Sequence, residues 1–200
     1  MKNILIATKN NDKYNIVSYL LEKICFPKTN NYKFYSLNDI KYDGPDQKEE
    51  GTLIHRAEIK AKTVKNYLDK INKNIFEFIV GTDDGINIKG NLQENIKELL
   101  KKILYEKYLE ENEEYSFYRA FCIISKENKI FKTVTIVPYK YKSKKNAEIK
   151  DNTYPLKQIS VPIGMDKSLS ELNEQERKIY CFGYSKVNLI KLKNEIELSK

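Results

Sequence analysis

The chain has 200 residues, of which 40% are hydrophobic and 12% aromatic, a composition typical of a folded protein and not of a disordered one. Its length is ample for a hydrophobic core and predicts a single domain over residues 1–200. Lysine and arginine number 36 against 28 acidic residues, and the net charge of +8 favours acidic partners such as nucleotides or nucleic acid.

The number and spacing of the cysteines argue against a structural zinc site and against a disulfide framework. Cys25, Cys122 and Cys181 stand far apart, and the chain has one histidine, so neither a structural zinc site nor a disulfide framework is expected. No stretch is long and apolar enough to span a membrane, and the first residues lead into a strand pattern instead of a signal peptide. We therefore expect a cytoplasmic protein with no membrane partner.

The first predicted elements are a strand, a polar turn and a helix. Ile4–Ala7 is a short apolar run, Thr8–Lys13 is polar, and apolar residues at helical spacing follow up to residue 24. A helix N-terminus after a strand attracts anions, because backbone N–H groups and the helix dipole point the same way. Thr8, Asn10 and Lys13 add a hydroxyl, an amide and an ammonium, which predicts a phosphate-binding turn. The simpler alternative is a β-α unit without a ligand.

Strands and helices alternate in the next segments. Tyr32–Ser36 predicts a strand and Leu37–Glu50 a loop, and Gly51-Thr52 opens a helix with an apolar stripe. Phe76–Val80 predicts a strand that ends at the turn Gly81–Gly85.

The second half combines a hairpin with further helices. The predicted elements are a helix at Leu92–Leu109, hairpin strands at Tyr115–Ser125 and Lys129–Val137, an exposed basic loop at Pro138–Asn152, a strand at Ile159–Val161 and a helical region from Ser170 that is broken at Gly183. Early alternation together with a hairpin predicts an α/β fold with a mixed central sheet flanked by helices.

Five segments, in order, carry a resemblance to a known family: Thr8–Lys13, Thr52–Ala61, Thr82–Ile86, Arg119–Cys122 and Val161–Leu172. They resemble the inosine/xanthosine triphosphate pyrophosphatase family, which cleaves aberrant purine nucleoside triphosphates to monophosphate and pyrophosphate. The resemblance implies two lobes around a nucleotide cleft, a nucleoside triphosphate as substrate, Mg²⁺ as cofactor and a homodimer.

The resemblance also assigns roles to individual residues. Thr8, Asn10 and Lys13 match the family's Thr-x-Asn-x-x-Lys turn, and Lys60 matches a lysine of its following helix; all four are implied to bind the substrate's phosphates. Asp83 fills the second place of an acidic pair and is implied to be the catalytic carboxylate.

Carboxylates are also the ligands that Mg²⁺ prefers, so Asp83 and Asp84 are the expected metal ligands. The simpler alternative for these two residues is an acidic turn that caps a strand. For Lys60 and Arg56, which lie one helical turn apart, it is a solvated helix flank.

The departures from the family pattern fall mostly at the base-binding end and in the metal-associated positions. His55 stands where the family has a metal-associated Glu, and an imidazole is a poor Mg²⁺ ligand. The alternative is that Glu49 or Glu50 compensates for that loss. The family's Gly-Tyr-Asp-Pro loop falls on Pro155–Gln158, and its purine-contacting Ser-His-Arg falls on about Cys181–Gly183.

Two function classes follow from these departures. The first is a divergent nucleoside triphosphate pyrophosphatase, and the alternative is a catalytically impaired nucleotide-binding or sensing protein of the same fold. A third reading is nucleic-acid binding through Tyr139–Lys145, where aromatic and cationic residues alternate. A charged surface loop explains that segment more simply, so a nucleic-acid partner is not expected.

Overall fold

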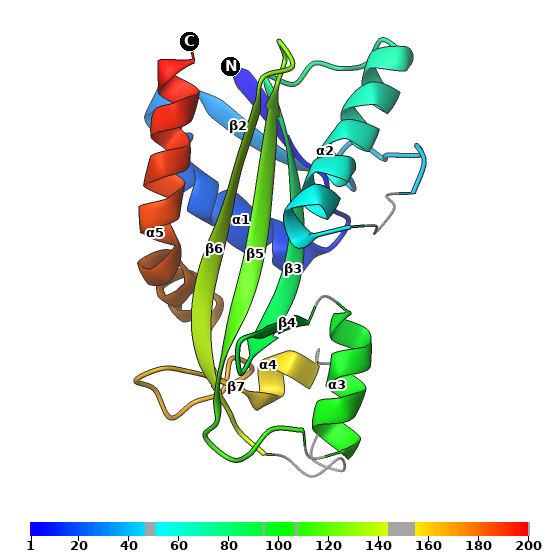
Figure 1. Cartoon of the computed structure of the whole chain (residues 1–200). Helices are drawn as coiled ribbons and strands as arrows, with labels where there is room; N and C mark the ends of the chain where they lie inside the picture. Colours follow the sequence, from blue (N-terminus) through cyan, green and yellow to red (C-terminus); the bar gives the residue numbers. More distant parts are fainter. Residues whose placement is uncertain (47–50, 94, 107, 144–154, 200) are drawn as a thin grey trace. The chain divides into compact units, whose positions relative to one another are not determined.

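The computed structural model describes residues 1–46, 51–93, 95–106, 108–143 and 155–199 (Figure 1). The strands are β1 (Lys2–Ile6), β2 (Tyr32–Ser36), β3 (Phe78–Ile88), β4 (Asn91–Gln93), β5 (Glu114–Ser125), β6 (Ile130–Tyr141) and β7 (Ser160–Pro162). The helices are α1 (Asn11–Ile24), the 3₁₀ helix η1 (Lys28–Asn30), α2 (Leu53–Lys70), α3 (Ile96–Tyr105), α4 (Pro155–Ile159) and α5 (Glu174–Leu198).

One mixed sheet runs through the chain in the order β2-β1-β3-β5-β6-β7, and β4 pairs with β3. β1 is parallel to both β2 and β3, whereas β7 is antiparallel to β6 and β4 is antiparallel to β3. The predicted α/β fold with a mixed sheet and flanking helices is therefore confirmed.

The chain divides into two compact units. The first unit comprises Met1–Asp83, Arg119–Thr135 and Ser185–Lys200, and the second comprises Asp84–Tyr118 and Ile136–Tyr184. The nucleotide cleft expected between two lobes stays a prediction.

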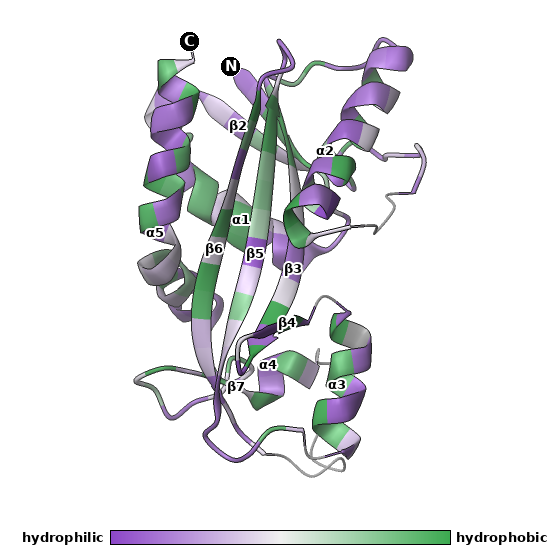
Figure 2. Ribbon diagram, viewed as in Figure 1, coloured by the Kyte–Doolittle hydropathy of each residue, from purple (hydrophilic) through white to green (hydrophobic). Residues whose placement is uncertain are grey.

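In the first unit, helices cover both faces of the sheet (Figure 1). α1 buries Val17, Leu20, Leu21 and Ile24 and packs on β1 and β2. The thiol of Cys25, just after α1, donates a 3.5 Å hydrogen bond to the Leu189 carbonyl of α5. α2 lies on the opposite face. Figure 2 shows hydrophobic and hydrophilic residues alternating along α2, as expected for a helix with one buried side.

Gly81 explains how closely α2 lies against β3. A Cβ atom at this position would come within 2.0 Å of the Ala57 carbonyl oxygen and 2.7 Å of the Ala61 nitrogen. These are backbone atoms, which no side-chain rotation can move away. Gly81, Ala57 and Ala61 together therefore allow the helix and the strand to meet almost backbone to backbone.

The second unit has its own hydrophobic core. Its side chains come from strands β3, β5 and β6, from helices α3, α4 and α5, and from the segment between α3 and β5: Ile86, Ile88, Leu99, Leu100, Ile103, Leu109, Tyr115, Val137, Tyr139, Tyr141, Leu156, Ile159 and Tyr180. Burial raises the pKa of the Tyr139 hydroxyl well above its ordinary value. Four tyrosines belong to this core, and their rings fill positions that aliphatic side chains occupy in most cores.

β3 corrects one prediction. The sequence pattern predicts a turn at Gly81–Gly85, but β3 continues through this segment to Ile88. Gly81 serves the close approach of α2, and Gly85 is itself buried, so neither glycine ends the strand. The predicted acidic turn at Asp83 and Asp84 is therefore wrong.

Three further boundaries differ. α3 covers only Ile96–Tyr105 of the predicted helix, because Asn91–Gln93 pairs with β3 as β4. β6 extends to Tyr141, so the predicted exposed loop begins in a strand whose Tyr139 and Tyr141 are buried; residues 144–152 lie outside the described ranges. α5 is continuous through Gly183, since packing on both sides outweighs the roughly 1 kcal/mol cost of one helical glycine.

None of the helices in the described ranges is long and apolar enough to cross a membrane.

Candidate functional site

The strand order of the first unit creates a natural binding position at the end of β1. β1 leads through α1 to β2 on one side, and the chain then returns through α2 to β3 on the other side. In parallel α/β sheets such a reversal leaves a crevice beyond the carboxyl ends of the strands, and ligands bind there. Thr8–Lys13 lies at this point of the fold.

Hydrogen bonds fix the conformation of the turn from Thr8 to Lys13. The Asn10 side-chain oxygen caps α1 by accepting from the Lys13 backbone N–H at 3.0 Å. The Thr8 hydroxyl accepts from the Asn10 N–H at 3.1 Å. The amide oxygen of Asn10 is thus committed to the helix, and the prediction that Asn10 binds phosphate rests on its NH₂ group.

The loop after β2 closes one side of the site. The Leu37 N–H donates to the Thr8 carbonyl at 3.1 Å, and the Asn38 side-chain amide donates to the Lys9 carbonyl at 2.9 Å. The Ser36 N–H and hydroxyl donate hydrogen bonds to the Asp39 carboxylate and so connect the loop to β2. The same hydrogen bonds lower the pKa of Asp39. The predicted loop from Leu37 is confirmed as far as residue 46.

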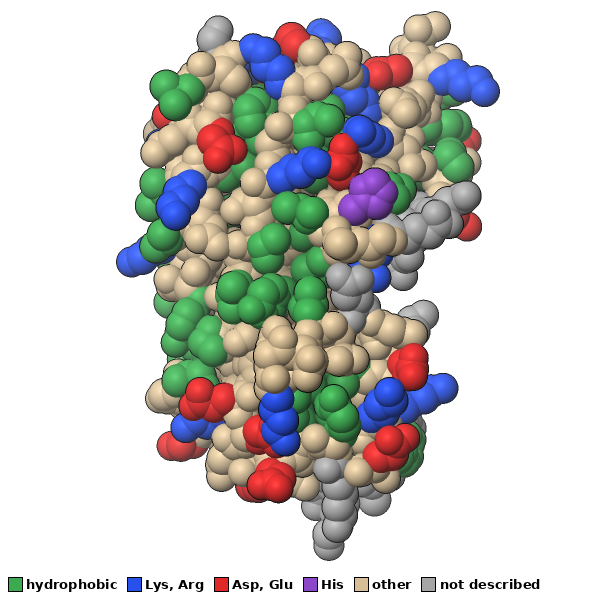
Figure 3. Space-filling model, in the orientation of Figure 1, with side chains coloured by type: hydrophobic (Ala, Val, Ile, Leu, Met, Phe, Trp, Pro, Cys, Tyr) green, Lys and Arg blue, Asp and Glu red, His purple; other side chains and the backbone are tan. Residues whose placement is uncertain are grey.

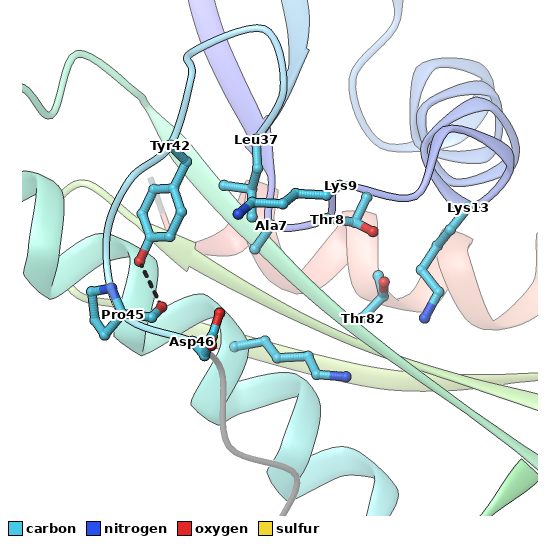
Figure 4. Close-up of a pocket in the computed structure, with 10 residues that line it drawn as sticks. Ala7, Thr8, Lys9, Lys13, Leu37, Tyr42, Pro45, Asp46 and Thr82 are labelled. Atoms are coloured by element: carbon cyan, nitrogen blue, oxygen red, sulfur yellow. Dashed lines mark hydrogen bonds between the residues drawn. The ribbon is translucent and has the colours of Figure 1, made fainter. Parts of the chain in front are cut away.

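These elements enclose a pocket of about 300 Å³. Figure 4 shows the Thr8, Lys13 and Thr82 side chains gathered on one side of it, with Tyr42 and Pro45 on another. The pocket is lined by Ala7, Thr8, Lys9, Lys13, Leu37, Tyr42, Pro45, Asp46, Lys60 and Thr82. The lining contains three lysines and one aspartate, so the pocket carries a net positive charge. Three of the four predicted phosphate-binding residues, Thr8, Lys13 and Lys60, therefore share one pocket.

Beside the pocket, Asp83 forms two buried ion pairs. Its Oδ1 lies 2.5 Å from Lys60 Nζ, and its Oδ2 lies 2.6 Å from Arg56 Nε. The three side chains are only 8–10% exposed. A buried charge is tolerated only when it is paired, so each cation depends on Asp83 and Asp83 depends on them. The alternative of a solvated helix flank for Arg56 and Lys60 is wrong.

The carboxylates of the described residues do not group into a ligand set for Mg²⁺. Asp83 and Asp84 are consecutive in a strand, so their side chains point to opposite faces of the sheet. Asp83 already has a cation on each oxygen. In the described part of the chain, no three His, Cys, Asp or Glu side chains are grouped closely enough to hold a metal ion. His55 is exposed, as predicted, and is the single purple side chain in Figure 3, while Glu49 and Glu50 lie outside the described residues.

Thr82 is a candidate that the sequence analysis missed. It is 2% exposed and lines the pocket, and its hydroxyl oxygen has no hydrogen-bond partner among the described residues. The resemblance places Thr82 where the family has the first Asp of its acidic pair, and a threonine at that place gives no indication of a role of its own. The position stands out only when burial and missing partners are known together.

The segments that replace the family's base-binding residues are helical. Pro155–Gln158 lies in α4, and Cys181–Gly183 lies in α5. Both belong to the second unit. The aromatic side chains of Tyr139–Lys145 are no stacking surface, because Tyr139 and Tyr141 are buried in that unit's core, whereas Lys144 and Lys145 are not described.

Solved structures of three bacterial proteins have a similar fold. The Ham1 protein of Staphylococcus aureus is 17% identical with a TM-score of 0.63, and the likeness covers 100% of both chains. A HAM1 protein from Coxiella burnetii is 15% identical with a TM-score of 0.63, covering 99% of this chain and 100% of that one. A nucleoside-triphosphatase, dITP/XTP pyrophosphatase, from Mycobacterium abscessus is 16% identical with a TM-score of 0.54, covering 91% and 94%.

Sequence comparisons add nothing to this likeness: no family model matches the chain, and no curated protein matches it either. At identities of 15–17%, the likeness is one of fold. It extends over 91–100% of the chain. The chain therefore has the fold of the Ham1 proteins and of the mycobacterial dITP/XTP pyrophosphatase.

Proposed function

We propose that this protein binds a nucleoside triphosphate through its phosphates in the pocket at the N-terminus of α1 and hydrolyses it to monophosphate and pyrophosphate. The observation that carries the proposal is the convergence of Lys9, Lys13 and Lys60 on one pocket beside a helix N-terminus. The first N–H groups of a helix have no partner within the helix and favour an anion. The fold of a dITP/XTP pyrophosphatase supports the same reaction class.

The proposed contacts follow from the pocket lining. Lys13 and Lys60 supply positive charge from opposite sides, one from α1 and one from α2. The Thr8 hydroxyl accepts a hydrogen bond from Asn10, and its own proton is the donor it can offer to a phosphate oxygen. Positioning and charge neutralisation supply most of the catalysis in phosphoryl transfer, so these groups bear directly on the rate.

Asp83 is the proposed catalytic carboxylate. A triphosphate carries several negative charges and competes with Asp83 for the Lys60 ammonium, which frees Oδ1 to accept a proton. A water oxygen then forms a bond to the α-phosphorus as its proton passes to Asp83. The bond from that phosphorus to the α–β bridging oxygen breaks, and pyrophosphate leaves with the electron pair. The proposed step uses side chains of this protein alone, since no three described His, Cys, Asp or Glu side chains lie close enough together to hold a metal ion.

A second candidate function is nucleotide binding without turnover. The Arg56 Nε–Asp83 Oδ2 contact favours it, since a guanidinium stays charged and holds the carboxylate even after Lys60 has moved. Under this reading Asp83 positions the cations instead of activating water. In both readings the base preference, a homodimer and a cytoplasmic location stay predictions.

Pyrophosphate release from a panel of triphosphates tests the proposal. The panel comprises ITP, XTP, dITP and the four common ribonucleotides, each measured with wild type and with the Asp83→Asn variant. Asp69→Asn is the matched control, because Asp69 also pairs with a lysine of α2 but lies outside the pocket. We expect turnover that Asp83→Asn reduces at least a hundredfold and Asp69→Asn leaves within twofold. Binding without release supports the second candidate, and the absence of binding contradicts both.

A further inference from the structure

We propose that the pocket binds polyphosphate without a divalent cation, because Arg56 and Lys60 both pair with Asp83, the one buried carboxylate beside the pocket among the residues that the structure describes. This inference rests on the proposed function and specifies how the ligand's charge is neutralised. Its basis is the pair of contacts that Asp83 makes, one to each oxygen.

In the ligand-free site a metal ion at Asp83 would have to displace both cations, and after a polyphosphate has drawn Lys60 away, Arg56 still holds Oδ2. A guanidinium keeps its positive charge in proteins, and the Arg56 side chain is 9% exposed. A divalent ion bound to Asp83 would lie close to the positive charges of Arg56 and Lys60 in a buried position, where like charges repel strongly. The Asp83 carboxylate balances the charges of Arg56 and Lys60. A divalent ion bound to the same carboxylate would disrupt both ion pairs.

The groups that line the pocket supply the charge that a metal would otherwise bring. Lys9, Lys13 and Lys60 outnumber Asp46, the single acidic residue in the lining. The buried Thr82 hydroxyl, which has no partner within the described residues, is a donor that a phosphate oxygen satisfies. An anion entering here meets three ammonium groups and two hydroxyls, those of Thr8 and Thr82.

The direction of the metal effect distinguishes this site from one built on Mg²⁺. Magnesium bound to a polyphosphate reduces the ligand's negative charge. In a pocket that is already cationic, this reduction weakens the attraction. In a site where a carboxylate holds the metal, the same ion strengthens binding.

Titration calorimetry with inorganic tripolyphosphate provides the test, once in EDTA and once in excess MgCl₂. We expect wild type to bind in EDTA with a Kd at least threefold lower than in MgCl₂. Binding that needs Mg²⁺, or is tenfold tighter with it, overturns the inference and leaves the proposed function intact. The absence of binding under both conditions overturns both.

Two variants sharpen the test. Asp83→Asn removes the anion shared by Arg56 and Lys60, so we expect its affinity in EDTA to stay equal or to rise up to tenfold; a tenfold loss contradicts the inference. Because this variant removes a carboxylate that contacts two buried cations, Arg56→Met is measured as well. It releases Asp83 Oδ2, and we expect MgCl₂ to strengthen tripolyphosphate binding by this variant. A magnesium response identical to that of wild type contradicts the proposed role of Arg56, and Asp69→Asn again serves as the control.

Discussion

At the scale of single residues, the site depends on Asp83 and its two cations. The resemblance to the pyrophosphatase family predicts Lys60 as a phosphate ligand and Asp83 as the catalytic carboxylate and a metal ligand. The structure instead pairs the two side chains at 2.5 Å across 23 positions in the sequence. No local pattern reports such a contact, because it depends on where α2 lies against β3.

Replacing Thr82 by valine is expected to change the stability of the protein and its affinity for tripolyphosphate in opposite directions. The Thr82 hydroxyl is buried without a partner among the described residues, and leaving such a group unsatisfied costs about 1–3 kcal/mol. Valine has nearly the same shape without the hydroxyl. We therefore expect Thr82→Val to raise the free energy of unfolding by about 1 kcal/mol and to weaken tripolyphosphate binding roughly tenfold. Urea denaturation and calorimetry measure the two effects.

The serine variant is the control for this prediction. Thr82→Ser keeps the hydroxyl and should bind within about threefold of wild type. A Thr82→Val protein that is less stable than wild type and binds as well would contradict the assignment of Thr82 as a ligand donor.

Glu58 provides a pH-dependent prediction in the first unit. Hydrogen bonds from Lys132 of β6 and Lys62 of α2, at 2.6 Å each, lower the pKa of its carboxyl from 4.5 to about 2. A lowered pKa in the folded state stabilises the protein above the unfolded-state value of 4.5, and this contribution disappears as the pH falls towards 2. Both lysines are partly exposed, so the contribution stays under about 1 kcal/mol.

The Glu58→Gln variant checks this sign. Its urea midpoint should lie below that of wild type at pH 7, and the difference should vanish near pH 2. A difference that is unchanged between these two pH values would show that the ion pairs contribute nothing to stability.

At the scale of elements, the contact between α2 and β3 positions the site. Arg56 and Lys60 reach Asp83 because Gly81 lets the helix approach the strand at Ala57 and Ala61. We expect Gly81→Ala to destabilise the protein by about 3 kcal/mol, since its Cβ would meet backbone atoms of α2. Thermal unfolding with and without tripolyphosphate measures both stability and binding, and the variant should lose both.

Gly183 is the matched glycine. A Cβ atom at this position meets nothing within 4 Å, and the residue lies within helix α5. Gly183→Ala should therefore stabilise the protein by up to about 1 kcal/mol. Equal effects of the two substitutions would contradict the close packing inferred at Gly81.

The same two glycines show where prediction from sequence succeeds and fails. The turn at Thr8–Lys13 and the start of a helix after Gly51-Thr52 are local patterns, and both predictions are confirmed. Gly81–Gly85 and Gly183 suggested breaks that do not exist, because tertiary packing determines whether a glycine ends an element or lets another element approach. Strand ends were missed for the same reason at Tyr139 and Tyr141, whose burial depends on distant partners.

At the scale of the whole molecule, the order of elements fixes the position of the pocket. The alternation of strands and helices in residues 1–88 predicts parallel strands, and their order places the end of β1 at the reversal point. The basic half of the pocket was therefore predictable. Its Tyr42, Pro45 and Asp46 were not, because they come from a loop that has no regular pattern.

The central claim, that phosphates bind at the N-terminus of α1, is tested most directly by calorimetric titration of one triphosphate, ITP, into wild type, Lys13→Gln and Lys23→Gln. Lys13 lies in the first turn of α1 and lines the pocket, whereas Lys23 lies in its last turn over the Tyr19 ring. A charged hydrogen bond contributes about 1.5–3 kcal/mol. We predict that Lys13→Gln weakens binding at least tenfold and that Lys23→Gln binds like wild type; equal affinities for all three proteins would contradict the account.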